Sequence, residues 1–180
     1  KDSAGREADW YGGITVNGLG AQYSDWKYKQ VLLSDSTDYS GSGLDDSAWP
    51  VGAAPFGNIR PGASDDGALA HAFDNRFSPV IGTTTNLDQR LWIRRTLTLS
   101  EIPAGGFTLV GYFDNAYAMY VNGNAVASGT ATLQAGVTKA LEASNFVVGE
   151  NVIAVRCDDD AASSSTDACY FDFLLDPVLE

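Results

Sequence analysis

Short runs of alternating apolar and polar residues, separated by turn residues, dominate the chain. The clearest example spans residues 107–129, where two strand-like segments flank the dipeptide formed by Asn122 and Gly123. This dipeptide favours the type I′ turn of a two-residue β-hairpin, because both residues tolerate positive φ angles. A hairpin with this turn would place Met119 opposite Val126 on one face, as the two-residue period of a strand requires.

Three further segments show the pattern of strands: residues 26–33, 91–99 and 149–156. In the second of these, Ile93, Leu97 and Leu99 share one face. The intervals between strands after residue 90 are typical of an all-β sandwich. Residues 58–90 form a long irregular segment that contains several Pro and Gly residues.

Four segments, taken in order, resemble the galactose-binding-domain-like β-sandwich: residues 45–58, 91–99, 117–129 and 149–156. This family supplies the accessory sugar-binding domains of many glycoside hydrolases, as well as carbohydrate-binding modules and lectins. The resemblance implies an antiparallel β-sandwich of the jelly-roll type with eight to ten strands.

The resemblance extends from about residue 26 to residue 175, most of the chain. We therefore expect a single domain over residues 1–180. Within it, residues 1–25 are expected to be an N-terminal strand of the same sandwich or an arm used in assembly.

Composition excludes several classes of function. The 180 residues are 44% hydrophobic, which excludes a disordered chain, and they carry a formal net charge of −12. Such an acidic chain should repel nucleic acid and anionic membranes, since both are bound through Lys and Arg. The longest apolar runs fall well short of the ~20 residues that a membrane span needs, so membrane insertion is not expected.

The motifs of known catalytic centres are missing from the sequence. His71 is the only histidine, and the chain has neither a G-x-S-x-G elbow nor a nucleotide-binding glycine motif. We expect a protein that is not an enzyme and requires no cofactor. The adjacent carboxylates of Asp45 and Asp46 offer hard oxygen ligands for a structural calcium ion, of the kind that similar sandwiches often hold. The alternative for this acidic pair is a solvated loop.

Two cysteines lie near the C-terminus. If the segments that contain Cys157 and Cys169 pair as a hairpin, their sulfur atoms lie close together at its neck. The alternatives are a disulfide and two buried thiols. A disulfide would indicate an oxidising compartment, and we expect an extracellular location or one on a cell or virion surface.

A candidate ligand-binding face follows from the alternation of side chains. Trp92 and Arg94 lie on the polar side of their strand, and Tyr112 and Tyr120 should also point away from the core. An aromatic ring with planar polar groups beside it is the chemistry that binds a pyranose. The alternative is that this face is covered by residues 58–90 or by the N-terminal strands. The full set of predicted ligand-binding residues comprises Trp92, Arg94, Tyr112, Asp114, Asn115, Tyr117 and Tyr120, with Asp114, Asn115 and Tyr117 in an adjoining loop.

The leading functional prediction, implied by the resemblance, is a non-catalytic extracellular module that binds a glycan or polysaccharide. One alternative is a structural subunit of an extracellular fibre, filament or virion, which would assemble as a homo-oligomer through its N-terminal strand. The other alternative is an accessory domain of a larger glycoside hydrolase.

Overall fold

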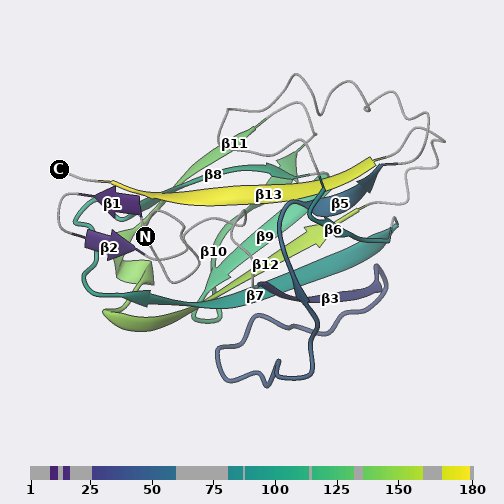
Figure 1. Cartoon of the computed structure of the whole chain (residues 1–180), viewed down its shortest axis with the longest axis horizontal. Helices are drawn as coiled ribbons and strands as arrows, with labels where there is room; N and C mark the ends of the chain where they lie inside the picture. The colour runs from purple at the N-terminus through teal and green to yellow at the C-terminus, as the bar shows by residue number, and fades with distance from the viewer. Residues whose placement is uncertain are drawn as a thin grey trace.

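The protein is a sandwich of two β-sheets packed face to face (Figure 1). The computed structural model describes residues 9–11, 14–16, 26–59, 81–86, 88–113, 115–131, 136–159 and 168–178. In this part of the chain, the one helical element is a 3₁₀ turn at Ala143–Asn145. None of the described helical structure is long and apolar enough to cross a membrane.

The larger sheet is antiparallel throughout its described pairs. Its spatial order is β1 (Asp9–Tyr11), β2 (Ile14–Val16), β7 (Gln89–Leu99), β12 (Gly149–Asp158), β9 (Asn115–Val121) and β10 (Asn124–Ala131). β3 (Trp26–Leu32) also pairs with β7 and carries the short β4 (Val51–Gly52) on its other side.

The second sheet has the order β11 (Val137–Leu141), β8 (Phe107–Phe113), β13 (Ala168–Pro177), β5 (Phe56–Ile59) and β6 (Thr83–Thr84). Its β5–β6 pair is parallel, a local departure from the antiparallel arrangement. The described part of the chain has thirteen strands, of which nine have four or more residues, whereas the prediction was eight to ten strands.

The predicted hairpin is present, with one difference in register. Asn122 and Gly123 have φ angles of 53° and 84°, as a type I′ turn requires. Met119, however, lies opposite Ala127, because the pairing shifts between residues 125 and 127. The predicted pairing of Met119 with Val126 is therefore wrong: a β-bulge inserts one residue that alternation alone does not reveal.

The predicted hairpin between the two cysteine-bearing strands is also wrong. β12 pairs with β7 and β9 in one sheet, whereas β13 pairs with β8 and β5 in the other. The physical reason is that two strands show the same alternation of core-facing side chains whether they are neighbours in one sheet or lie in opposite sheets across the core. Cys157 is buried in that core. The Cys169 side chain lies outside the described residues, so a disulfide between them stays a prediction.

The N-terminal strands belong to the molecule's own larger sheet. β1 and β2 pair with each other, and Val16 pairs with Leu99 of β7. β1 ends the described order of this sheet, so the fibre alternative, with assembly through the N-terminal strand, stays a prediction.

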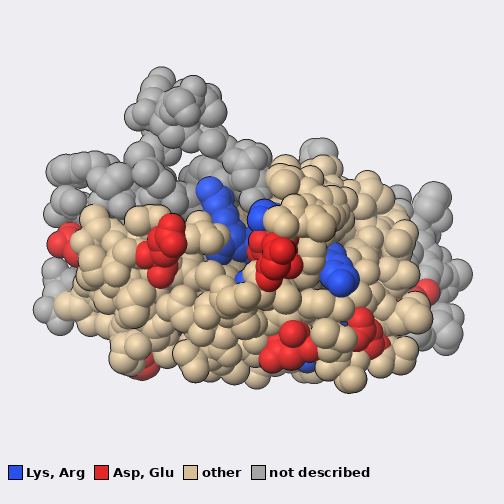
Figure 2. Space-filling view, turned by 90° about the horizontal axis from the view of Figure 1, so that it is seen from below, with Lys and Arg blue, Asp and Glu red and all other residues tan. Residues whose placement is uncertain are grey.

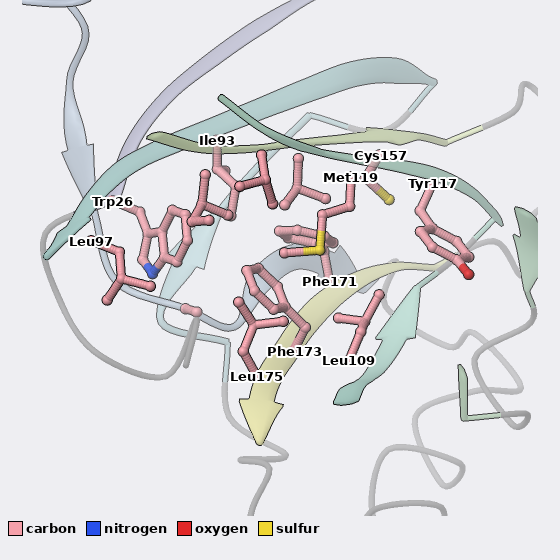
Figure 3. Packing of buried hydrophobic residues seen from close by; sticks show 14 of the residues in the cluster. Trp26, Ile93, Leu97, Leu109, Tyr117, Met119, Cys157, Phe171, Phe173 and Leu175 are labelled. Atoms are coloured by element: carbon pink, nitrogen blue, oxygen red, sulfur yellow. The ribbon is translucent and has the colours of Figure 1, made fainter. Parts of the chain in front are cut away.

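The core fills the space between the two sheets (Figure 3). The Trp26 ring from β3 meets the Phe173 ring from β13 edge-on, with centroids 5.4 Å apart. At the other end of the core, the Phe113 and Tyr117 rings stack at 4.3 Å. These contacts join one sheet to the other, so burial of this apolar surface stabilises the sandwich as a unit.

Candidate functional site: an aromatic cavity beside strand β3

The predicted ligand-binding face of β7 is covered. Trp92 is 2% exposed and Arg94 is 1% exposed, so neither is available to a sugar in this structure. Both side chains point outward, away from the core, as the alternation predicted. The prediction of an exposed face is wrong because the connection formed by residues 33–50 lies over these two side chains. The Tyr39 ring packs edge-on against the Trp92 ring at 5.8 Å.

Arg94 holds this connection on the sheet. Its guanidinium donates hydrogen bonds to the carbonyl oxygens of Tyr39, at 2.6 Å, and Gly41, at 2.9 Å. It also donates to the Asp46 carboxylate at 3.0 Å. Every nitrogen of this buried cation therefore has an acceptor, and these hydrogen bonds offset the cost of removing its charge from water. Arg94 is a structural anchor for residues 33–50.

The remaining predicted ligand residues are dispersed. Tyr112 lies on the outer face of the second sheet, on the opposite side of the sandwich from Trp92. Tyr117 is 3% exposed in the core, where burial raises its pKa. The predicted loop is absent at Asn115 and Tyr117, because β9 already begins at Asn115. The single predicted face for these residues is therefore wrong.

Two further members of that predicted set need separate mention. Tyr120 does lie beside Trp92 on the outer face of the larger sheet, with ring centroids 5.7 Å apart. It is half-buried there. Asp114 lies outside the described residues.

The two candidate calcium ligands have other partners. Asp46 accepts hydrogen bonds from Lys27 at 2.6 Å and from Arg94. Partial burial raises its pKa, but these two cations more than offset that effect and hold the pKa below its usual value. Hydrogen bonds from the Ser47 side chain and from the Ser47 amide lower the pKa of Asp45. Within the described ranges, no three His, Cys, Asp or Glu side chains are grouped to hold a metal, and calcium stays an untested prediction.

A cavity of about 490 Å³ opens beside β3, where the chain passes from Asp45 to Pro50. Its size is within the range of small-molecule sites. Its lining residues are Tyr28, Lys29, Gln30, Asp45, Ala48, Trp49 and Pro50. Of these, the Tyr28 ring packs towards the core against Phe56, and Gln30 Nε2 donates to the Asn86 carbonyl oxygen at 3.3 Å.

Trp49 is the central aromatic residue of this cavity. Its ring is half-buried and packs edge-on against Tyr39 at 5.6 Å, outside the core. The Lys29 ammonium lies 4.4 Å from the centre of the Tyr39 ring and 5.8 Å from that of Trp49. Cation–π attraction therefore holds the Lys29 side chain against these rings at the cavity.

The resemblance to galactose-binding-domain-like sandwiches also implies that Trp26 and Trp49 pack in the core. This is confirmed for Trp26, which is 2% exposed, and wrong for Trp49. A signal was present, because Trp49 precedes Pro50 at the end of a polar, Gly-rich stretch and not within an alternating strand. What the sequence did not show is that this stretch folds back over β3.

Fold and site together define a class: a β-sandwich with a partly aromatic cavity at one edge of a sheet. No protein-family model and no curated protein matches this sequence. Solved structures do match. Bacteroides uniformis β-glucuronidase 2 is 19% identical with a TM-score of 0.56, and the match covers 87% of this chain and 17% of that one.

Two other structures give the same result. A glycosyl hydrolase family 2 member from Bacteroides cellulosilyticus is 17% identical over 90% of this chain and 20% of its own, with a TM-score of 0.52. A β-glycosidase from Bacteroides vulgatus is 19% identical over 88% and 20%, with a TM-score of 0.51. At these identities the shared feature is the fold: this chain has the β-sandwich that occurs over about a fifth of these hydrolases.

Proposed function

We propose that this chain is a non-catalytic accessory domain of an extracellular glycoside hydrolase and that it binds carbohydrate in the Trp49 cavity. The finer assignment, which we also propose, is to the galactose-binding-domain-like jelly rolls. The observation that carries the proposal is the cavity itself, with Trp49 beside several polar groups. The fold supports it, because matching sandwiches occur within glycosyl hydrolase family 2 structures.

The proposed mode of binding is stacking combined with hydrogen bonding. The apolar face of a pyranose would lie on Trp49, while the exposed Asp45 carboxylate would accept hydrogen bonds from its hydroxyl groups. Trp49 is held by its contacts with Tyr39 and Lys29, so little ordering is required on binding. Binding to one such site is expected to be weak and to become useful when other parts of an enzyme hold the same polysaccharide.

Replacing Trp49 tests this function. Trp49→Ala should weaken binding of the preferred oligosaccharide about 30-fold, because a central aromatic contact is worth ~2 kcal/mol. Isothermal titration calorimetry against an oligosaccharide identified on a glycan array is the measurement. Trp49→Phe keeps an aromatic face and should retain most of the affinity.

Val148→Ala is a matched control, since Val148 is 64% exposed on a different connection. It should bind as the unaltered protein does. Loss of affinity in Trp49→Ala counts only if its circular dichroism spectrum is unaltered. Equal binding by Trp49→Ala and the unaltered protein would contradict the proposed site, and no binding to any glycan would contradict the proposed function.

A further inference from the structure

We propose that the Trp49 cavity selects an anionic sugar, one that carries a carboxylate or sulfate group, through the ammonium group of Lys29. This inference rests on the proposed function, since it requires that the cavity binds carbohydrate. It adds the class of ligand and the residue that distinguishes it from neutral sugars.

Lys29 is the first reason for this selectivity. Lys27, Arg90, Arg94 and Arg156 each lie within 4 Å of a carboxylate oxygen. Lys29, in contrast, forms no ion pair within the described part of the chain, and its ammonium lies instead over the rings of Tyr39 and Trp49. These rings fix the side chain but do not neutralise its charge. The Asp35 carboxylate also interacts with the Lys29 ammonium through its charge. The ammonium nevertheless lies at the cavity as a cationic donor held in position by the two rings.

The other cations near Lys29 on the outer face of the sheet are paired with carboxylates. On the outer face of the larger sheet, Lys27 and Arg94 share the carboxylate of Asp46. Arg90 and Arg156 likewise share that of Asp158. Figure 2 looks onto the side of the molecule on which β3 lies, and basic residues gather near the middle of this view with acidic residues beside them.

The register places two of these cations near Trp92, which lies beneath Tyr39. Lys29 of β3 is opposite Trp92 on one side, and Arg156 of β12 is opposite it on the other. These cations share two carboxylates, and the Asp35 and Asp45 carboxylates also interact with Lys29, Arg90 and Lys27 through their charges. Cations and carboxylates are thus interspersed around the cavity, so the preference for an anion rests on Lys29 itself.

Asp45 restricts the ligand further. Its carboxylate lines the same cavity, and its Oδ1 accepts the Ser47 amide while the side chain remains exposed. A carboxylate repels a simple anion but accepts hydrogen bonds well from hydroxyl groups. A cation for one acidic group and a carboxylate for hydroxyls suit an acidic sugar better than an inorganic anion or a neutral sugar.

The test compares matched oligosaccharides on the full chain by isothermal titration calorimetry. The ligands are a uronic acid oligosaccharide, a sulfated one of equal length and a neutral one of equal length. Each is measured at ~0.05 M and at ~1 M salt, between which the Debye length falls from about 14 Å to about 3 Å. The variants are Lys29→Gln, Lys29→Arg and the control Lys139→Gln, which removes the same charge from exposed Lys139 on β11.

We expect the unaltered protein to bind at least one anionic oligosaccharide about tenfold more tightly than the neutral one, and this preference to fall at high salt. Lys29→Gln should bring the ratio close to one, Lys29→Arg should retain most of it, and Lys139→Gln should retain all of it. The stronger of the uronate and the sulfate ligands identifies the acidic group.

The outcomes separate this inference from the function on which it rests. Equal binding of neutral and anionic ligands, or a preference that survives in Lys29→Gln, would overturn the role of Lys29 and leave the carbohydrate site intact. Binding to none of the three classes at millimolar concentration would overturn both. Binding of inorganic sulfate as tight as that of the sulfated sugar would also overturn the inference, since the sugar ring would then contribute nothing.

Discussion

At the scale of single residues, the orientation of the Arg94 side chain was predicted correctly, but its predicted role in ligand binding was wrong. Alternation along β7 correctly placed this side chain away from the core, but the side chain is 1% exposed under residues 33–50. Its partners are carbonyl oxygens of Tyr39 and Gly41 and the carboxylate of Asp46, all more than 45 residues away along the chain. No local pattern reports contacts at such a separation.

Arg94→Ala should therefore destabilise the protein rather than change ligand binding directly. Removal of the guanidinium leaves buried carbonyl groups without donors and Asp46 with one cation, which should cost about 3 kcal/mol. Urea denaturation followed by tryptophan fluorescence is the measurement. Lys139→Ala, which removes an exposed cation elsewhere, should change stability by less than ~0.5 kcal/mol. Similar stabilities for the two variants would show that the Arg94 contacts are not what holds residues 33–50.

Asp172 predicts a pH dependence. This residue of β13 is 0% exposed on the outer side of the second sheet, and its Oδ1 accepts the Phe173 amide at 2.9 Å. Burial raises the pKa of its carboxyl to about 7, although the Phe173 amide and the Tyr170 hydroxyl lower it in part. In the unfolded chain the same carboxyl has a pKa near its ordinary value, ~4.

The folded state thus binds the Asp172 proton more tightly than the unfolded state does. This contribution to stability is complete below pH ~4 and is lost as the pH rises to about 7, by up to ~4 kcal/mol in total. Asp172→Asn cannot ionise, so its free energy of unfolding should decline less over this range. Thermal unfolding from pH 4 to 8 is the measurement, with exposed Glu101→Gln as the control. Parallel pH profiles for Asp172→Asn and the unaltered protein would refute the prediction.

At the scale of elements, local chemistry was a better guide to strands and turns than to their neighbours. The turn at Asn122 and Gly123 follows from two residues that tolerate positive φ. The bulge near Val126 and the separation of β12 and β13 into different sheets do not follow from local chemistry. The bulge and the division into two sheets both depend on which strands pair. The two-residue alternation of side chains does not identify the partner of a strand.

The connection from β7 to β8 gives a prediction at this scale. Gly106 has a φ of +71°, and a Cβ atom built there would lie 2.1 Å from the Leu141 carbonyl oxygen and 2.7 Å from the Ala143 amide nitrogen. Both are backbone atoms, which cannot rotate away, so Gly106→Ala should cost more than ~2 kcal/mol.

The matched control is Gly43→Ala, because a Cβ at Gly43 meets nothing within 4 Å. It should leave the free energy of unfolding within ~0.5 kcal/mol of that of the unaltered protein. Chemical denaturation of both variants compares them directly. Equal stability of the two would mean that the 3₁₀ turn at residues 143–145 moves easily, contrary to its close packing against Gly106.

At the scale of the whole molecule, the two sheets should unfold together. They share one core, in which contacts such as that between Trp26 and Phe173 cross from sheet to sheet. Far-ultraviolet circular dichroism, which reports the strands, and tryptophan fluorescence, which reports the packing, should give the same midpoint in urea. Separate midpoints would show that one sheet survives without the other, and our expectation of a single domain would be wrong.

Alternation, turn dipeptides and strand spacing were sufficient to predict the class of fold, because they are local properties of the chain and do not depend on which strands become neighbours. The sequence by itself also determined which side chains of β7 point into the core and which point out. Only the tertiary structure decided which outward side chains are exposed: residues 33–50 fold over Trp92 and Arg94 and bring Trp49 to the edge of β3. Exposure depends on segments that are distant along the chain, and for that reason the candidate site moved from Trp92 to Trp49 once the fold was known.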